Sequence, residues 1–305
     1  MNAFSIEKLN DSFSLKGEDY GLIFRSGEGG IPMVDIHNQQ ASAAVSLQGS
    51  HVLSWVPVAN DEMIWLSEKA RFAHGKSIRG GIPICWPWFG AHVSNTGYPA
   101  HGFARTSLWQ VADTQLLASG ETKITFRLNT REFDDAIRVM WPLATVVEFC
   151  LTVGHTLTMS LTTYNYSDEA ITIGQALHTY FSVNDIRRTV VYGLENREYL
   201  DKTDGFMRKT QDGPVIFDGE VDRVYLQTVD DIIIDDGGRK VRIKKQGSES
   251  TVLWNPWLEL AERMGDLGED GYLKMLCVES ANAAEDIVRI AAGDNYTLSV
   301  SYAIE

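Results

Sequence analysis

Apolar and polar residues alternate with a period of two along most of the chain. The alternation is clear over residues 123–128 and again over 145–166, where Gly154 and His155 divide the pattern into two segments. Successive side chains of a strand point to opposite faces of a sheet, so this period indicates strands with one buried face. Residues 145–166 therefore predict two consecutive antiparallel strands.

Two further segments predict hairpins, because each has Asp and Gly between two alternating runs. They are residues 231–245 and residues 287–304. Helical periodicity is scarce: only residues 257–264 fit two helical turns, ending at Gly265. Strands continue from about residue 13 to the C-terminal end without a linker or a change in composition. We therefore expect an all-β, antiparallel sandwich or barrel-like fold with few short helices, in a single domain over residues 1–305.

Composition and charge exclude several classes of protein. The chain has 305 residues, 44% of them apolar and 22% charged, which is typical of a globular protein. Its net charge of −14 argues against binding to nucleic acid or to an acidic membrane, since both need a basic surface. No apolar run approaches the ~20 residues that span a bilayer, and the N-terminal sequence lacks the pattern of a secretory signal. We expect a cytoplasmic protein.

The three cysteines are widely spaced and form no CxxC motif, which argues against a disulfide framework or a standard zinc site. Cys150 and Cys277 lie in apolar, strand-like runs and are expected to be core residues. The sequence also lacks GxSxG, P-loop and GxGxxG patterns, so triad hydrolases, NTPases and dinucleotide enzymes are not indicated. Compact metal-ligand spacing is absent among the other residues considered: His74, Cys85, His92 and His101.

The segment 78–106 is rich in glycine and proline, which argues against a helix or a long strand there. It carries Arg79 near its start and Arg105 near its end, with Trp86 and Trp88 between them. Glycine allows close approach of the backbone to a ligand, and aromatic rings provide flat apolar walls. The alternative is structural: the aromatic residues cap the sandwich and the arginines pair with carboxylates.

Residues 171–183 predict a strand with Gly174, Ala176, His178 and Tyr180 on one face. The two small residues leave space beside the imidazole, which suits the floor of a ligand site. The alternative is that His178 is a hydrogen-bonded structural residue.

Two carboxylates are further candidates. Glu279 follows Cys277 on one face of the strand predicted within residues 271–280, and burial there would raise its pKa toward that of a useful general base. The alternative is that the strand has reached solvent at Glu279. Asp222 lies in the segment GEVDRVY, where it could instead form a surface ion pair with Arg223.

Six motifs occur in order: RGGIPICWPWFG, PAHGFAR, ALHTYF, EVDRVY, WNPW and DGYLKMLCVE. Together they resemble the hexose-6-phosphate mutarotase (glucose-6-phosphate 1-epimerase) branch of the aldose 1-epimerase family, over roughly residues 45–300; residues 1–40 carry no matching motif. The resemblance implies a large two-sheet β-sandwich of the galactose mutarotase type with the active site on its concave face. It also implies reversible interconversion of the α and β anomers at C1 of a hexose 6-phosphate.

Residue roles follow from the same resemblance. It implies that His178 is the general acid, Glu279 the general base and His101 a second active-site histidine that helps to hold the substrate. It implies substrate contacts for three further residues: Arg79, Arg105 and Asp222. Some relatives carry Gln where this chain has Ala100, so a side-chain hydrogen bond is absent there. No cofactor or metal is implied, and we expect a monomer whose partner is a small sugar phosphate.

The arginines suggest why this branch differs from enzymes that act on neutral sugars. Permanently charged, planar guanidinium groups bind phosphate oxygens in pairs. We therefore expect the loop to grip the phosphate while its tryptophans form a wall for the sugar. Three rival functions remain: a non-catalytic carbohydrate-binding protein, a mutarotase for a non-phosphorylated aldose, and a glycoside hydrolase with Asp222 and Glu279 as its two carboxylates.

Overall fold

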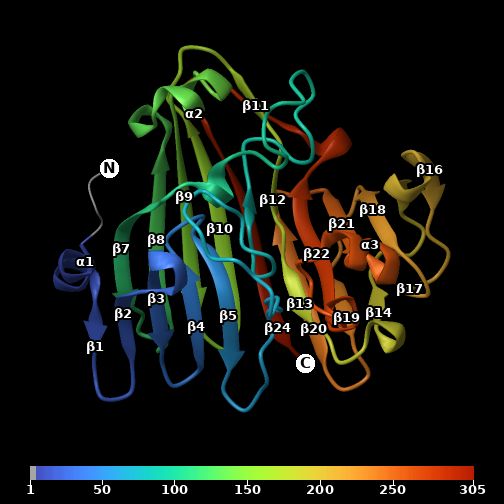
Figure 1. Cartoon of the computed structure of the whole chain (residues 1–305), viewed down its shortest axis with the longest axis horizontal. Coiled ribbons are helices and arrows are strands. Elements are labelled where there is room, and N and C mark those ends of the chain that lie inside the picture. Colours follow the sequence, from blue (N-terminus) through green and yellow to red (C-terminus); the bar gives the residue numbers. More distant parts are fainter. Residues whose placement is uncertain (1–4) are drawn as a thin grey trace.

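Strands dominate the architecture, which the computed structural model describes for residues 5–305 (Figure 1). The described residues form four sheets, and every strand pair within them is antiparallel. The helices are few and short: α1 (Ile6–Phe13), α2 (Asp135–Met140) and α3 (Trp257–Met264). The prediction of an all-β sandwich with few short helices is confirmed.

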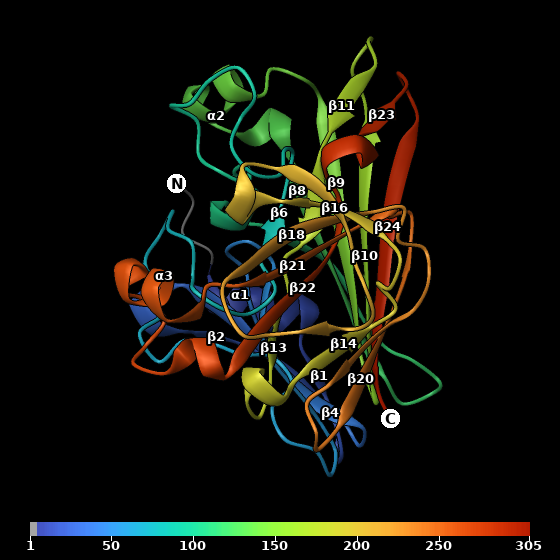
Figure 2. The same ribbon diagram turned by 90° about the vertical axis from the view of Figure 1, so that its right-hand side faces the viewer.

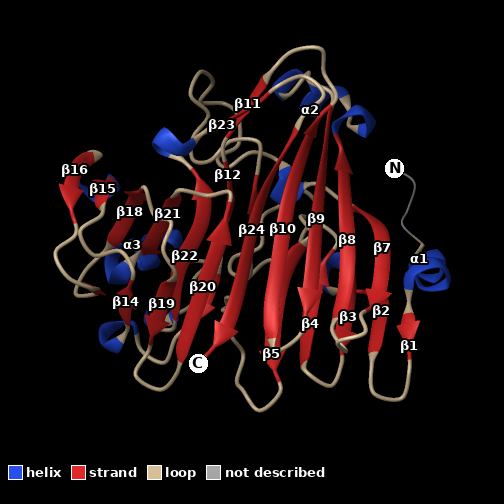
Figure 3. Ribbon diagram, turned by 180° about the vertical axis from the view of Figure 1, so that it is seen from behind, coloured by secondary structure: helices blue, strands red, loops and turns tan. Residues whose placement is uncertain are grey.

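The largest sheet has nine strands in the order β17-β14-β19-β20-β24-β10-β9-β8-β7. Figure 3 shows its long strands side by side across the back of the molecule. The bounds are β7 (Gln110–Leu116), β8 (Thr122–Asn129), β9 (Thr145–Val153), β10 (Thr156–Asn165), β14 (Val190–Tyr192), β17 (Val215–Ile216), β19 (Ile232–Asp235), β20 (Lys240–Gln246) and β24 (Asn295–Ile304).

An eight-stranded sheet supplies most of the site described below. Its order is β16-β15-β18-β21-β22-β12-β6, with β13 also paired to β22. The bounds are β6 (Ile84–Cys85), β12 (Gln175–Leu177), β13 (Tyr180–Ser182), β15 (Glu198–Asp201), β16 (Met207–Thr210), β18 (Val221–Leu226), β21 (Ser250–Asn255) and β22 (Met275–Asn282).

The N-terminal part forms a five-stranded meander in which each strand pairs with the next along the chain. It lies beside the eight-stranded sheet in Figure 1, and a bridge between Val52 and Ile82 links the two. The bounds are β1 (Leu15–Lys16), β2 (Gly21–Ser26), β3 (Pro32–His37), β4 (Ala41–Ser46) and β5 (His51–Pro57). A separate pair consists of β11 (Ile171–Ile173) and β23 (Val288–Ile290).

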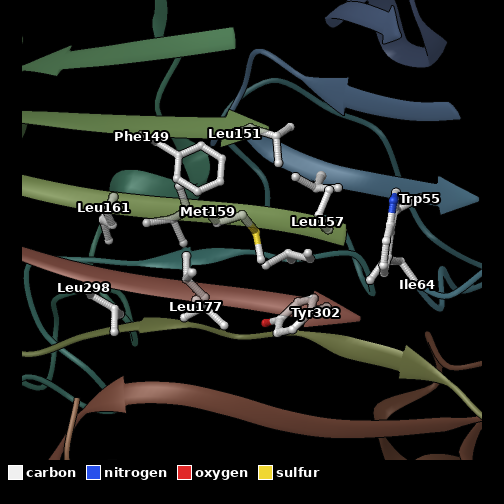
Figure 4. Packing of buried hydrophobic residues seen from close by; sticks show 14 of the residues in the cluster. Trp55, Ile64, Phe149, Leu151, Leu157, Met159, Leu161, Leu177, Leu298 and Tyr302 are labelled. Atoms are coloured by element: carbon white, nitrogen blue, oxygen red, sulfur yellow. The ribbon is translucent and has the colours of Figure 1, made fainter. Parts of the chain in front are cut away.

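The core lies between the nine-stranded sheet and the layer made by the other two large sheets, which Figure 2 shows from the side. In Figure 4, Phe149 and Met159 from β9 and β10 lie near Leu177 from β12, and Trp55 from β5 lies beside Ile64 at the other end of the same cluster. Residues of this cluster range from Leu9 to Tyr302. The single domain over residues 1–305 is a proposal that this shared core supports, for the described part of the chain.

Two of the three predicted hairpins are confirmed, whereas two other strand predictions are wrong. Residues 145–166 form the paired strands β9 and β10, and residues 231–245 form the hairpin of β19 and β20, as predicted. The hairpin predicted for 287–304 is wrong: β23 pairs with β11, whereas β24 lies between β20 and β10. The continuous strand predicted for 171–183 is also wrong, because it is divided into β11, β12 and β13.

Candidate active site

A cavity of about 400 Å³ opens on the eight-stranded sheet, and all six residues singled out in the sequence line it. They are Arg79, His101, Arg105, His178, Asp222 and Glu279. This volume lies within the ~300–1,000 Å³ typical of small-molecule sites. Residues from distant parts of the chain thus meet around one space large enough for a hexose phosphate.

The strand register explains why these side chains share a face. Residues directly opposite each other in an antiparallel pair project to the same side of the sheet. Leu177 pairs with Ser280 and Tyr180 with Cys277, so His178 lies opposite Glu279.

A second row of paired residues crosses the sheet beside the first. Cys277 pairs with Trp254, and Trp254 pairs with Asp222. Because Asp201 pairs with Arg223, the next residue, Lys202, comes beside Asp222. Trp254, Asp222 and Lys202 all line the cavity.

His178 and Glu279 form a close, buried pair. Nε2 of His178 lies 3.4 Å from Oε1 of Glu279, and the two residues are only 8% and 1% exposed. The His178 ring stacks on Tyr180 with a centroid distance of 4.9 Å and an interplanar angle of 9°, which fixes its orientation. The strand has therefore not reached solvent at Glu279.

Burial shifts both members of the pair toward their neutral forms. It raises the pKa of Glu279 well above its usual range, and the positive charges of Lys202 and Arg105 offset this only in part. Burial, with the neighbouring His101 and Arg105, lowers the pKa of His178 well below its usual range. The two side chains can exchange one proton across their 3.4 Å contact. Transfer of this proton from the carboxyl group of Glu279 to the imidazole of His178 gives a carboxylate and an imidazolium without any change in the total number of bound protons.

His101 is held by the backbone in a neutral form. The backbone N–H of His101 donates to the carbonyl of Gly90 (2.7 Å), and the ring Nδ1 of His101 accepts from the backbone N–H of Gly90 (3.3 Å). Burial, followed by the charges of Arg105 and Lys202, lowers the pKa of His101 to about 3. With Nδ1 accepting, the neutral ring carries its proton on Nε2, which makes that atom a hydrogen-bond donor.

The two arginines are not equivalent. Nε of Arg79 donates to both carboxylate oxygens of Asp266 at 3.1 Å, and its Nη1 donates to the hydroxyl of Tyr180 at 2.9 Å. Arg105 donates to the carbonyl of Ala100 (2.9 Å) and has no carboxylate partner among residues 5–305. The ion-pair alternative thus holds for Arg79, whereas Arg105 keeps a charge that no acid neutralises.

Asp222 does not pair with Arg223. Lys202 contacts both carboxylate oxygens of Asp222, at 2.7 and 2.8 Å. The Arg223 guanidinium instead lies 4.7 Å from the centre of the Tyr199 ring. Lys202 and Asp266 are the charged cavity residues that sequence reasoning missed, and no local pattern around either one indicates a site.

The predicted tryptophan wall is wrong. Trp86 is fully buried in the core and donates to Thr163, and Trp88 packs against other aromatic rings of its own loop. Phe89 is the aromatic residue of this loop that lines the cavity, together with Trp254 from β21. The structural alternative therefore holds for both loop tryptophans, because both rings pack against other side chains and neither lines the cavity.

Comparison with known proteins agrees with this arrangement. The family model described as "Aldose 1-epimerase" matches residues 32–303. The chain belongs to this family. An Escherichia coli relative named "Putative glucose-6-phosphate 1-epimerase" is 36% identical over 258 residues, covering 84% of each chain. A relative of the same name from Cenchrus ciliaris is 35% identical and covers 83% of this chain and 78% of its own.

Solved structures share the fold over most of the chain. The crystal structure of a "putative mutarotase" from Salmonella typhimurium superposes with a TM-score of 0.85 at 30% identity and 98% coverage of both chains. A galactose mutarotase related enzyme from Lactobacillus acidophilus shares the fold at 13% identity, with a TM-score of 0.69 over 89% of this chain and 96% of its own. The family and the fold expected from the six sequence motifs are confirmed.

Proposed function

We propose that this member of the aldose 1-epimerase family interconverts the α and β anomers of a hexose 6-phosphate, with glucose 6-phosphate as its preferred substrate. The observation that carries the proposal is the contact between His178 and Glu279 in a cavity that also holds an unpaired arginine. The names of the relatives from Escherichia coli and Cenchrus ciliaris agree with this reaction and substrate class.

The reaction needs one proton removed and one delivered. Glu279, as carboxylate, takes the proton of the C1 hydroxyl while the C1–O5 bond breaks, and His178, as imidazolium, protonates the ring oxygen. Rotation of the C1 aldehyde and reversal of both transfers gives the other anomer. A positioned acid or base typically contributes ~10²–10⁴ in rate, and the reaction transfers neither electrons nor a chemical group. The two side chains therefore suffice, and we propose that no cofactor takes part.

The substrate phosphate is proposed to bind at the arginines. Arg105 offers a guanidinium without breaking an ion pair, and Arg79 adds a second one once Asp266 yields. Neutral His101 is proposed to donate from Nε2 to a sugar oxygen, and Asp222 to accept from a sugar hydroxyl. These groups are placed to hold the ring while C1 turns.

An anomerisation assay tests the proposal directly. Fresh α-glucose 6-phosphate is followed by polarimetry or exchange NMR with wild type, Glu279→Gln and His178→Asn, beside unphosphorylated glucose. We expect rapid equilibration by the wild type and a loss of kcat by ~10²–10⁴ in each variant, because each removes one proton-transfer group. Unfolding curves that match the wild type serve as the control.

The same assay separates the rivals. Equal rates on glucose and glucose 6-phosphate would indicate a mutarotase without phosphate preference, and binding without anomerisation would indicate a carbohydrate-binding protein. Any product other than the anomer would indicate a hydrolase. Near-normal turnover in either variant would remove that residue from the mechanism.

Two expectations from the sequence remain proposals: that the protein acts as a monomer, and that it works in the cytoplasm. Among residues 5–305, no helix has the length and apolarity that crossing a membrane requires. Light scattering on the purified protein tests the first, and cell fractionation the second.

A further inference from the structure

Three side chains of different chemistry meet beneath the sugar cavity. A ring nitrogen of His178, the Sγ of Cys277 and a carboxylate oxygen of Glu279 all lie within 4.8 Å of one another, and all three residues are buried. Cys277 and Glu279 come from alternate positions of β22, and the register places His178 opposite Glu279. Cys277 is a free thiol.

The spacing is close to that of a tetrahedral metal site. Zinc binds nitrogen and oxygen at ~2.0–2.2 Å and sulfur at ~2.3 Å, which separates tetrahedral ligands by roughly 3.4 Å for nitrogen and oxygen and 3.6 Å for nitrogen and sulfur. The His178 and Glu279 atoms already lie 3.4 Å apart. Since the sulfur lies within 4.8 Å of both other ligand atoms, drawing in the thiol requires a movement on the order of 1 Å.

The carboxylate of this trio also has unused bonding capacity. Oε2 of Glu279 and Nδ1 of His178 are buried without a hydrogen-bond partner in the described part of the chain. Buried polar atoms without partners are rare in native proteins and need an explanation. A cation held by the Glu279 carboxylate and by Nε2 of His178 would give Oε2 of Glu279 a partner, whereas Nδ1 of His178 lies on the other side of the ring and stays unpaired among the described residues.

We propose that His178, Cys277 and Glu279 form a binding site for Zn²⁺, with a fourth position that faces the sugar cavity. One nitrogen, one sulfur and one oxygen ligand suit zinc, whereas Mg²⁺ and Ca²⁺ prefer ligand sets made of oxygen alone. The local charge permits such a cation, because Asp266 and Asp222 neutralise two of the three cavity cations.

Zinc in this site inhibits the enzyme, a consequence that rests on the proposed function. A bound cation occupies the lone pairs with which Glu279 and His178 exchange protons, and its fourth ligand competes with the sugar. The binding itself does not depend on any activity.

Co²⁺ is a suitable probe, because a thiolate ligand adds a near-ultraviolet charge-transfer band and four-coordination adds intense visible bands. The protein is titrated with Co²⁺ in phosphate-free buffer, and Zn²⁺ is then added in competition. We expect both sets of bands at one equivalent and their loss as Zn²⁺ displaces the cobalt. Cys277→Ser should abolish the charge-transfer band, and Cys85→Ser, a matched buried cysteine on β6, should keep it.

Affinity gives a second measurement. Cys277→Ala and Glu279→Gln should each weaken Zn²⁺ binding by more than the ~10–100-fold typical for loss of an outer-shell partner. Matching unfolding curves identify the variants that remain folded, and Cys277→Ala covers the case in which the serine variant does not fold. A charge-transfer band that survives in Cys277→Ser, or a cobalt complex without such a band, would overturn the proposal.

To measure inhibition, the enzyme is loaded with one equivalent of Zn²⁺ and passed through a desalting column. The anomerisation rate of each loaded protein is then compared with the rate of the same protein without metal. We expect loss of anomerisation by the loaded wild type and recovery with EDTA. Full activity of the loaded wild type would overturn the inhibitory role. A Cys277-dependent cobalt spectrum in a protein that does not anomerise sugar phosphates would refute the proposed function and leave the metal site standing.

Discussion

At the scale of single residues, the charges of the cavity fall into pairs. Arg79 is bound by Asp266 and Lys202 by Asp222, so within residues 5–305 the cavity groups without a fixed ionic partner are Arg105 and the Glu279–His178 pair. The protein as a whole carries a charge of −14, which repels an anionic substrate. Arg105 is therefore the cation that a phosphate reaches at the lowest cost.

Replacing the two arginines should separate their contributions. Arg105→Met should raise KM for glucose 6-phosphate by ~10–150-fold, the equivalent of the ~1.5–3 kcal/mol of a hydrogen bond to a charged group. Arg79→Met should raise it less, because the phosphate gains Arg79 only by displacing Asp266. Initial rates of anomerisation give KM for both variants, and residual activity toward glucose is the control. Equal effects on the two sugars would count against phosphate binding at these residues.

Lys202 should act on Glu279 as well as on Asp222. It is the strongest of the positive charges that lower the pKa of Glu279, so Lys202→Met should raise that pKa further. Since the proposed base is the carboxylate, the acid limb of kcat/KM should move to higher pH. Lys202→Arg should restore the wild-type profile, and Lys209→Met, whose lysine pairs with Asp201 and Asp204, should leave it unchanged. An unshifted acid limb in Lys202→Met would refute this role.

Motifs in the sequence indicated the six candidate residues, but not the charges that surround them. Arg79 and Asp266 are 187 positions apart, and nothing near Asp266 distinguishes it from other acidic residues of the chain. Lys202 reaches Asp222 only because β15 and β18 pair in one particular register. Such contacts depend on long-range pairing, which the local pattern does not encode.

At the scale of elements, local signals predicted hairpins and helix ends, and sheet context decided the rest. The helix predicted over 257–264 from its helical periodicity is confirmed, and it ends at Gly265, which has the left-handed conformation (φ 69°). The hairpin predicted for 287–304 does not form, because β24 pairs with the longer strand β10 over nine residues and not with the three-residue strand β23. The Gly293-Asp294 turn signal therefore marks a turn without fixing which strands it joins.

The loop that carries His101 should depend on Gly102. A Cβ at this position would lie 1.9 Å from the carbonyl oxygen of Trp86, and its φ is +71°. Gly102→Ala should therefore lower the free energy of unfolding by more than the ~1–3 kcal/mol of backbone strain alone, and should raise KM as His101 shifts. Gly90→Ala is the matched control: its φ is +75°, but nothing lies within 4 Å of the added Cβ. Urea unfolding measures both, and equal losses would contradict the steric account.

At the scale of the whole molecule, buried titratable groups link stability to pH. Burial lowers the pKa of His51 to about 4 and that of His101 to about 3, so the folded protein holds both rings neutral where the unfolded chain protonates them. Their contribution to stability is complete above pH ~6.5 and is lost as pH falls toward these folded values. In the His178–Glu279 pair the two shifts oppose each other in the number of protons bound, because burial lowers the pKa of the imidazole and raises that of the carboxyl group.

The effect of His51 on the pH dependence of stability can be measured separately, because His51 is not among the residues that line the cavity. Its Nε2 contacts the carbonyl of Gly80 at 2.8 Å, a hydrogen bond that the amide of a glutamine can also donate. Between pH 6 and 4.5 the unfolded wild-type chain carries most of one proton at this position, whereas the folded protein keeps the ring largely neutral. The free energy of unfolding should therefore fall more steeply in the wild type than in His51→Gln, by ~1 kcal/mol per pH unit. Urea unfolding at pH 7.0, 6.0, 5.0 and 4.5 measures the two slopes; parallel slopes would mean that His51 is protonated in the folded protein.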